Sequence, residues 1–243
     1  AKLNLHQPRP STVPSNTPAV PLACMLGFML HLDGIRYQSA TAAAPVLDGI
    51  DLDLAPGQLG LVAGRSGSGK TTLLEIISGL AEPTAGQIRW QERRLDARHR
   101  RWLCGLVFQF PERHFLGLTV GQELKLGHRR LSADDAAAVL RQVGLASLSL
   151  QQQPEQLSGG QQRRLALAVQ LLRNPRVLLL DEPTAGLDWS VRDEIVALLA
   201  QLARERTVLV VSHEPELFAD IAGPSWQLDA GRLRTMPPEL RAA

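Results

Sequence analysis

Several features that would indicate other classes of protein are absent from this sequence. No apolar run approaches the roughly 20 residues needed to span a bilayer, and the longest early run, Val20 to Leu30, contains Gly27. The two cysteines, Cys24 and Cys104, form no C-x-x-C pair, so neither a zinc site nor a disulfide framework is indicated. Reduced thiols in a cytosolic protein are expected. A role at a membrane requires docking on a partner.

The net charge and the share of aromatic side chains are also low. The net charge is +2 and aromatic residues make up 4% of the chain, so no strong global field argues for nucleic acid. One local basic run lies between Gln91 and Arg101. We interpret it as a solvated turn, because no aromatic platform interleaves its charges; the alternative is a contact with nucleic acid or acidic lipid. Its arginines are Arg93, Arg94, Arg98, Arg100 and Arg101.

The most informative stretch that is present fits G-x-x-x-x-G-K-[ST], the phosphate-binding loop. Glycines let consecutive N–H groups point at phosphate oxygens. Lys70 places a charge on the β- and γ-phosphates, and the Thr71 hydroxyl can reach Mg²⁺. A strand is predicted over 59–63 before the loop and a helix over 72–79 after it, with the helix N-terminus favouring phosphate. The residues of the stretch are Gly64, Arg65, Ser66, Gly67, Ser68, Gly69, Lys70, Thr71 and Thr72.

The wider pattern predicts an α/β fold. Strands over 29–37 and 46–54 come first, and the alternation of the second indicates an antiparallel subdomain. Later strands alternate with helices, which favours a mostly parallel sheet with the phosphate loop at its edge. These strands are expected over 103–108, 176–180 and 207–211, the helices over 136–143, 162–173 and 191–204, and a hairpin over 226–233.

We expect one folded domain over 26–236, with a helical subdomain over about 110–170. A disordered, Pro-rich tail is expected over 1–25 and a short tail over 237–243. Two further interpretations of the first segment stay open. It faintly resembles a transit peptide, or it precedes a true start at Met25 or Met29.

Polar residues follow the predicted parallel strands, at the edge where open α/β sheets bind ligands. Asp181 is expected to be the Mg²⁺-associated carboxylate, and Glu182 can orient or deprotonate water, the alternative being two carboxylates kept for solubility. His213 and Gln109 each end a strand and are candidates to touch the γ-phosphate, the water or Mg²⁺. Tyr37 either stacks on adenine or is a partly buried core aromatic.

A second glycine turn, Leu157-Ser158-Gly159-Gly160-Gln161, opens a predicted helix. It is either an anion site or an ordinary N-cap. Together with the motifs described above, this turn makes the chain resemble the ATP-binding-cassette ATPases, the nucleotide-binding subunits of ABC transporters. The resemblance runs from about Met29 to Arg234. The resemblance identifies 64–72 as Walker A, Gln109 as the Q-loop, 157–161 as the signature, 177–182 as Walker B, 185–188 as the D-loop, His213 as the switch histidine and Tyr37 as the A-loop aromatic.

The resemblance implies a P-loop NTPase core that binds ATP and Mg²⁺ and hydrolyses ATP. Two subunits, this chain with itself or with a paralogue, pair head to tail, so that Ser158 and Gly160 contact the γ-phosphate in trans. Gly159, Gln161 and Asp188 belong to the same implied nucleotide interface. Glu182 is implied to be the catalytic base with His213 as its partner. Thr71, Asp181 and Gln109 are implied metal contacts, Gln109 also linking the site to a transmembrane subunit.

The branch most resembled is the energy-coupling-factor group, which imports vitamins or transition metals. Val107-Phe108-Gln109-Phe110-Pro111-Glu112 carries this likeness, although Phe110 and Glu112 replace the usual Asn and Asp. Trp189 stands where proline is common. The implied place is the cytoplasmic face of the cell membrane, or the stromal side of a chloroplast membrane, with no nucleic acid. The alternative is an ABC ATPase of DNA repair, chromosome organisation or translation, which usually has a long coiled coil or a second cassette.

Overall fold

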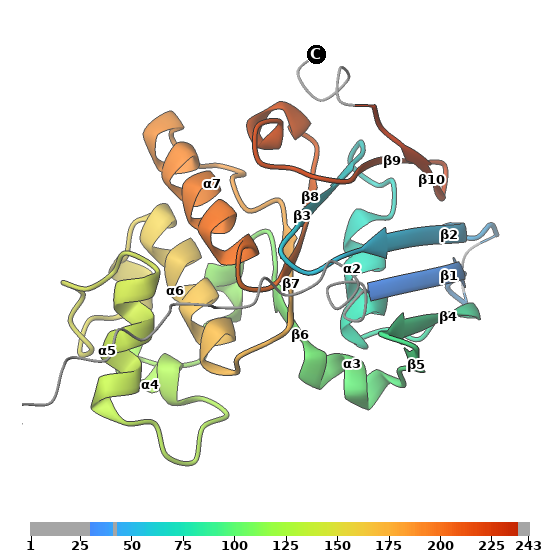
Figure 1. Cartoon of the computed structure of the whole chain (residues 1–243). Coiled ribbons are helices and arrows are strands. Elements are labelled where there is room, and N and C mark those ends of the chain that lie inside the picture. The colour runs from blue at the N-terminus through green and yellow to red at the C-terminus, as the bar shows by residue number, and fades with distance from the viewer. Residues whose placement is uncertain (1–29, 41–42, 238–243) are drawn as a thin grey trace, which may run out of the picture.

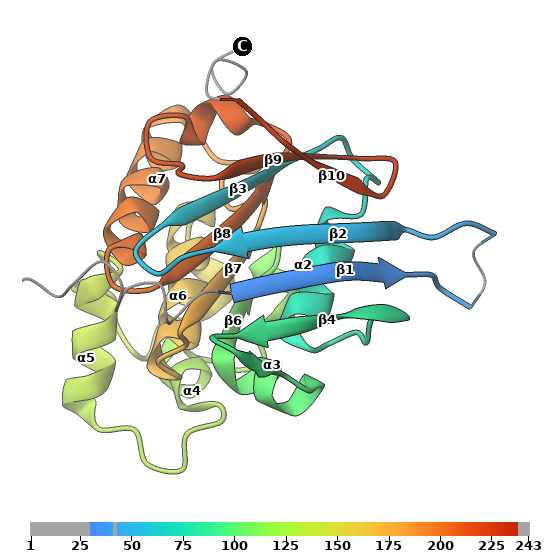
Figure 2. The ribbon, with the colours of Figure 1, turned by 45° about the vertical axis from the view of Figure 1, so that its right-hand side comes forward.

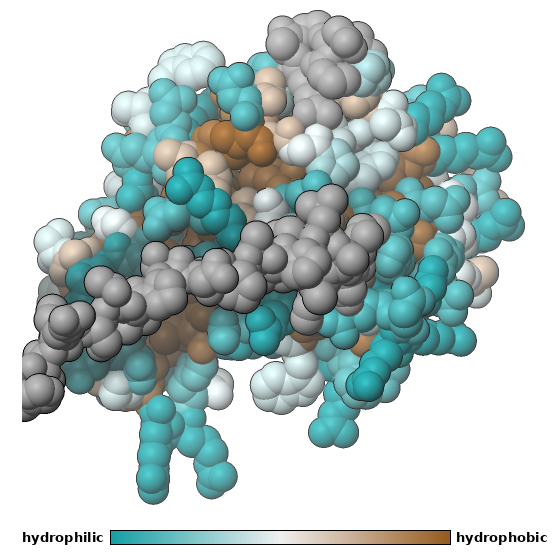
Figure 3. Space-filling model, viewed as in Figure 1, coloured by the Kyte–Doolittle hydropathy of each residue, from teal (hydrophilic) through white to brown (hydrophobic). Residues whose placement is uncertain are grey.

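Helix α2 (Lys70–Ser78) lies between two β-sheets and shares its apolar side chains with both. The computed structural model describes residues 30–40 and 43–237. The predicted tails, apart from Pro237, therefore lie outside the described residues, as do Cys24 and Met29. Figures 1 and 2 show α2 with the four-stranded sheet on one side and the longer sheet on the other. Hydrophilic residues cover most of the face seen in Figure 3.

The smaller sheet is antiparallel throughout, as the alternating sequence pattern predicts. In β2 the side chains of Ile50, Leu52 and Leu54 are buried, while Asp51 and Asp53 are exposed. One face of the sheet therefore packs on α2 and the other meets solvent. The strand order is β2-β1-β4-β5, with β1 at Leu30–Tyr37, β2 at Leu47–Leu54, β4 at Ala85–Trp90 and β5 at Arg93–Arg94.

The larger sheet is parallel except for its edge strand β10, which pairs antiparallel with β9. Its order is β10-β9-β3-β8-β7-β6. Every residue of β3 and β7 is buried, as expected for strands covered on both faces. The phosphate loop therefore leaves the carboxyl edge of an inner strand. The strands are β3 (Leu59–Ala63), β6 (Cys104–Val107), β7 (Val177–Asp181), β8 (Thr207–Ser212), β9 (Ser225–Asp229) and β10 (Arg232–Thr235).

Alternate side chains of these strands enter two different cores. Val177 and Leu179 pack toward α2, whereas Leu178 and Leu180 pack toward the later helices. The period of two in a strand produces this division. The later helices are α4 (Val120–Lys125), α5 (Ala133–Gln142), α6 (Gly159–Leu172) and α7 (Trp189–Ala203), with short 3-10 helices at Pro111–His114, Pro154–Gln156 and Pro215–Phe218.

The prediction of a solvated turn between Gln91 and Arg101 was wrong in its secondary structure beyond Glu92, because the segment goes on to form β5 and most of helix α3 (Ala97–Leu103). Four of its five arginines are exposed to solvent, as expected, and Arg100 is buried. The side chain of Asp96 accepts a hydrogen bond from the His99 N–H at 2.8 Å and so caps this helix. The predicted strand that follows is shorter than expected, because Leu103 still belongs to α3.

Candidate nucleotide-binding site

The phosphate loop wraps the N-terminus of α2 and lines a cavity of about 680 Å³. Gly67 and Gly69 have φ angles of 79° and 101°, a region that favours glycine. A Cβ on Gly64 would lie 2.8 Å from the Leu228 carbonyl oxygen, so the first glycine is required by close packing. The Lys70 Nζ donates hydrogen bonds to the carbonyls of Gly64, at 2.7 Å, and Arg65, at 3.2 Å.

Thr71 and Asp181 meet at the same end of the cavity. The Thr71 hydroxyl donates to Asp181 Oδ2 at 2.6 Å, joining α2 to the end of β7. Burial raises the pKa of Asp181 above its ordinary value, and the Glu182 charge raises it further, against the Thr71 hydrogen bond and the Lys70 charge. A hydroxyl and a carboxylate are hard oxygen ligands, the kind that Mg²⁺ prefers. The pair therefore fits a magnesium ion.

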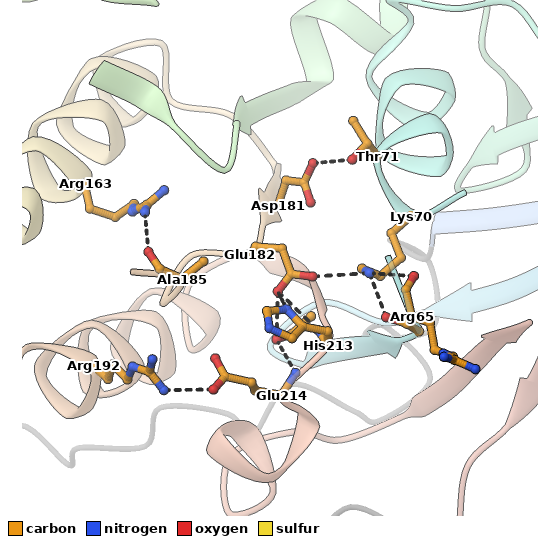
Figure 4. A network of polar contacts seen from close by, with 12 residues as sticks. Arg65, Lys70, Thr71, Arg163, Asp181, Glu182, Ala185, Arg192, His213 and Glu214 are labelled. Atoms are coloured by element: carbon orange, nitrogen blue, oxygen red, sulfur yellow. Dashed lines mark hydrogen bonds and ion pairs between the residues drawn. The ribbon is translucent and has the colours of Figure 1, made fainter. Parts of the chain in front are cut away.

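Glu182 is buried, with 5% of its surface exposed, and lies at the centre of a polar network (Figure 4). Its Oε1 lies 3.2 Å from Lys70 Nζ. Its Oε2 accepts from the His213 N–H at 3.1 Å and from the Ser212 hydroxyl at 3.2 Å, and lies 2.8 Å from His213 Nδ1. The backbone of Glu182 has a φ of 47°, which is uncommon for a non-glycine residue and frequent at functional sites.

Gln109 lines the cavity from the end of β6, and its main chain is anchored by an arginine that sequence reasoning missed. Arg163 of α6 is 4% exposed. Its Nη1 donates to the Gln109 carbonyl and its Nη2 donates to the Ala185 carbonyl at 3.0 Å. Burial lowers the pKa of this guanidinium. The only available signal was the position of Arg163 two residues after the glycine turn, and it does not reveal the carbonyl partners.

Several predicted nucleotide contacts do not line this cavity. Tyr37 packs against the core formed with α2. Ser158 caps α6, its hydroxyl accepting from the Gln161 N–H at 3.3 Å while Gln161 Oε1 accepts from the Ser158 N–H at 2.9 Å. Both possible roles of the turn remain, since a capped helix end can also bind an anion. Outside the lining set are Tyr37, Ser68, Ser158, Gly159, Gly160, Gln161 and Asp188.

The lining set also contains residues that the sequence did not indicate. Val46 reaches the cavity from just before β2, Pro215 from the segment after His213, and Gln227 from β9. Ser68, within the loop, has a buried hydroxyl with no hydrogen-bond partner and does not line the cavity. The buried Lys70 and the glycine loop at the N-terminus of α2 together fit the phosphates of a nucleotide.

Comparison with known proteins decides the family. The model of the family described as ABC transporter matches residues 47–185. This chain belongs to the ABC transporter family. ABC transporter I family member 11, chloroplastic, of Arabidopsis thaliana is 40% identical over 218 residues, covering 83% of this chain and 78% of that protein. The energy-coupling factor transporter ATP-binding protein EcfA2 of Symbiobacterium thermophilum is 38% identical over 213 residues, covering 82% and 74%.

The fold of this ABC protein also matches a solved relative. The structure of cbiO1 from Clostridium perfringens, described as part of the ABC transporter complex cbiONQ, superposes with a TM-score of 0.79 at 26% identity, covering 88% of this chain and 90% of that one. The predicted P-loop NTPase core with its antiparallel subdomain is thereby confirmed. This ABC protein binds ATP and hydrolyses it to drive transport. Within residues 30–40 and 43–237, none of its helices has the length and hydropathy required to span a bilayer.

Proposed function

We propose that this chain is the ATPase subunit of an energy-coupling-factor-like importer that carries a vitamin or a transition metal ion. The single observation that carries the mechanism is the Glu182 network, in which a buried carboxylate faces Lys70 and is held by Ser212 and His213. The likeness to the EcfA2 protein and to cbiO1 supports the importer branch. The relative named chloroplastic keeps open a stromal location beside the cytoplasmic face of a cell membrane.

In this proposal each cavity residue has one task during ATP hydrolysis. The loop N–H groups and Lys70 hold the β- and γ-phosphates. Glu182 Oε takes the proton of the water that attacks the γ-phosphorus, while the bond to the ADP oxygen breaks. His213 keeps the Glu182 carboxylate aligned with that water. Thr71, Asp181 and Gln109 would hold Mg²⁺, which neutralises developing charge when bound.

In this proposal a second subunit supplies five of the predicted nucleotide contacts. The signature residues Ser158 to Gln161 and Asp188 do not line the cavity of their own chain. A head-to-tail pair brings the signature of one subunit over the phosphate loop of the other. Because ATP binds the closed pair better than the open subunits, it shifts the population toward the dimer. The partner is a second copy or a similar ATPase.

A transmembrane subunit docks beside Gln109 in the same proposal. Leu116 and Leu118 follow the Q-loop and are 80% and 77% exposed. We assign this pair of exposed leucines, close in sequence to Gln109, to the surface that the transmembrane subunit covers. Movement of that partner then reaches the cavity through Gln109, and ATP hydrolysis reopens the dimer.

The test is the oligomeric state of a Glu182→Gln variant with ATP and Mg²⁺, measured by light scattering. Slow hydrolysis with a trapped dimer is expected. The matched control is Glu182→Gln combined with Lys70→Ala, which is expected to stay monomeric because it loses the phosphate contact. A monomer that binds ATP would overturn the self-paired form and require a different ATPase as partner. A variant that binds no ATP would overturn the proposed site.

A further inference from the structure

Helix α3 carries a cationic and aromatic surface that the ATPase site does not use. Arg98, Arg101 and Trp102 are all exposed, Trp102 to 73%. Their spacing of three and four residues places them on one face of the helix. Arg173, at the end of α6, donates from Nη2 to the Arg101 carbonyl and lies beside them. We call these four residues the α3 surface.

The positive charge of the α3 surface is not neutralised by the protein. The carboxylates that precede α3 are already engaged: Asp96 lies 2.8 Å from His99, and Glu92 lies 3.5 Å from Arg89. Glu82, which meets the buried side of α3, lies 2.7 Å from Arg100 Nη2. In the part of the chain that the structure describes, no carboxylate forms an ion pair with Arg98, Arg101 or Arg173. Arg98 and Arg101 are therefore exposed without an ion-pair partner, on the same helix face as a large exposed indole ring. Arg173, which hydrogen-bonds to the neutral groups of Gln170 and Arg101, adds a third unneutralised charge.

Arginine beside an exposed tryptophan matches the chemistry of a lipid headgroup layer. Guanidinium groups bind phosphate through two parallel hydrogen bonds, and tryptophan concentrates at membrane–water interfaces because its ring is amphipathic. Nucleic acid fits less well, since a single indole offers no series of stacking positions. The surface therefore favours anionic lipid over other polyanions.

The place of α3 in the molecule agrees with this choice. In both Figures 1 and 2, α3 lies at the same lower end as α4 and the loop that follows it. Hydrophilic side chains project from this end in Figure 3. Leu116 and Leu118, proposed above to dock on a membrane subunit, directly precede α4. A docked subunit at this end brings α3 toward the bilayer.

We propose that the α3 surface binds the anionic phospholipid headgroups of the membrane in which the transporter lies. This rests on the peripheral membrane location proposed above, but not on the transported substrate or on the pairing of subunits. Charge attraction adds to the docking of the membrane subunit and orients the ATPase. The contribution decreases with ionic strength, because exposed charges are screened within about 10 Å at 0.1 M salt.

The experiment is co-sedimentation of the purified full chain with vesicles of phosphatidylcholine alone or mixed with phosphatidylglycerol. We expect binding only to the anionic vesicles, weakened by salt. Each Arg→Gln change should weaken binding about fivefold, so Arg98→Gln with Arg101→Gln should lose about 25-fold. Brominated lipid should quench Trp102, shown by comparison with Trp102→Ala.

The matched control removes two arginines that are exposed but ion-paired. Arg36 and Arg232 lie 3.4 and 3.2 Å from Asp48 oxygens, so Arg36→Gln with Arg232→Gln makes the same change in charge elsewhere. An equal loss of vesicle binding in the Arg98/Arg101 and Arg36/Arg232 double variants would overturn the proposal. So would the absence of binding to anionic vesicles at low salt. Tighter binding to single-stranded DNA through Arg98 and Arg101 would also overturn it. Unchanged ATPase rates in all variants separate this result from a failure of the proposed nucleotide site.

Discussion

Arg192 Nη1 lies 2.9 Å from Glu214 Oε1, and this ion pair joins two segments that flank the site. The Arg192 Nε also donates to the Leu187 carbonyl at 2.8 Å, directly before Asp188. Glu214 follows His213, and its N–H donates to the Ser212 hydroxyl at 3.0 Å. The guanidinium thus ties the segment before α7 to the residues that hold Glu182 (Figure 4).

We predict that Arg192 and Glu214 position His213 as a unit. Arg192→Gln and Glu214→Gln should each lower kcat for ATP hydrolysis by about five- to tenfold with little change in KM, since neither residue lines the cavity. The double variant should be no slower than either single one, because residues in contact are not additive. Steady-state kinetics of the three variants measures this coupling, which we expect to be about 1 kcal/mol.

The control for this pair is Arg164 with Glu194, an ion pair that joins α6 to α7. Neither residue lines the cavity. Removing that pair should lower the melting temperature slightly and leave kcat unchanged. Additive effects of Arg192→Gln and Glu214→Gln would show that the two side chains act separately.

Arg163→Gln should destabilise the protein by about 3 kcal/mol, because burying carbonyls without a donor costs roughly 1–3 kcal/mol each. The carbonyls of Gln109 and Ala185 lose their donor. Denaturant unfolding measures the loss. Arg163→Lys should recover part of it, since one ammonium cannot match the fork of the guanidinium. The more exposed Arg164→Gln should cost about 1 kcal/mol, and equal losses at 163 and 164 would contradict the anchoring role.

Gly160→Ala should destabilise the nucleotide-free protein by about 1–3 kcal/mol through overpacking. A Cβ at this position would lie 2.4 Å from Val191 Cγ1, on α7. Val191→Ala removes that atom and should restore most of the loss. Gly159→Ala is the control, since its Cβ meets only the end of the Leu187 side chain, at 3.2 Å. Thermal unfolding of Gly160→Ala, Val191→Ala, the two combined, and Gly159→Ala measures these effects. A combined variant no more stable than Gly160→Ala alone would contradict the overpacking.

Asp181→Asn should make the nucleotide-free protein more stable at neutral pH. Burial raises the pKa of Asp181 above its ordinary value of 3.8. The folded state then holds the proton more tightly than the unfolded state. The stability that this proton contributes is therefore fully present below pH 3.8 and is lost as the pH rises through the raised pKa. The advantage of the variant should therefore be absent near pH 4, grow as the pH increases, and level off once Asp181 is ionised.

Melting temperatures across that pH range measure this advantage. Asp33→Asn should show the opposite sign, because the Arg89 hydrogen bond lowers the pKa of Asp33. The Asp33→Asn variant should be less stable than the unsubstituted protein above pH 3.8, the ordinary pKa of Asp33, and this difference should disappear as the pH falls through the lowered pKa. An Asp181→Asn advantage that does not change with pH would contradict the assignment to ionisation.

Local patterns determined much of this protein before its structure was known. The glycine motif that ends at Lys70 predicted a phosphate-binding loop between a strand and a helix. The apolar run before Asp181 predicted a buried strand. Because the carboxyl ends of parallel strands share one edge, the meeting of Lys70, Asp181, Glu182 and His213 followed from strand order alone. The structure brings these residues and Gln109 to one cavity. An alternating strand pattern and a contiguous motif each lie within one short segment, so the sequence of that segment is enough to predict the element or loop that it forms.

Only the tertiary structure decided the contacts that join distant segments. No pattern indicated that Arg163 bonds main-chain carbonyls of two loops, or that Arg192 reaches Glu214. Helix α3 replaced the expected turn because Asp96 caps it and Arg100 is buried against Glu82. Tyr37, expected either at adenine or as a partly buried core aromatic, is partly buried against the core that includes α2, and its contact with adenine stays a prediction. Such contacts depend on how distant segments pack in space, and neither composition nor the spacing of residues along the chain indicates which segments meet.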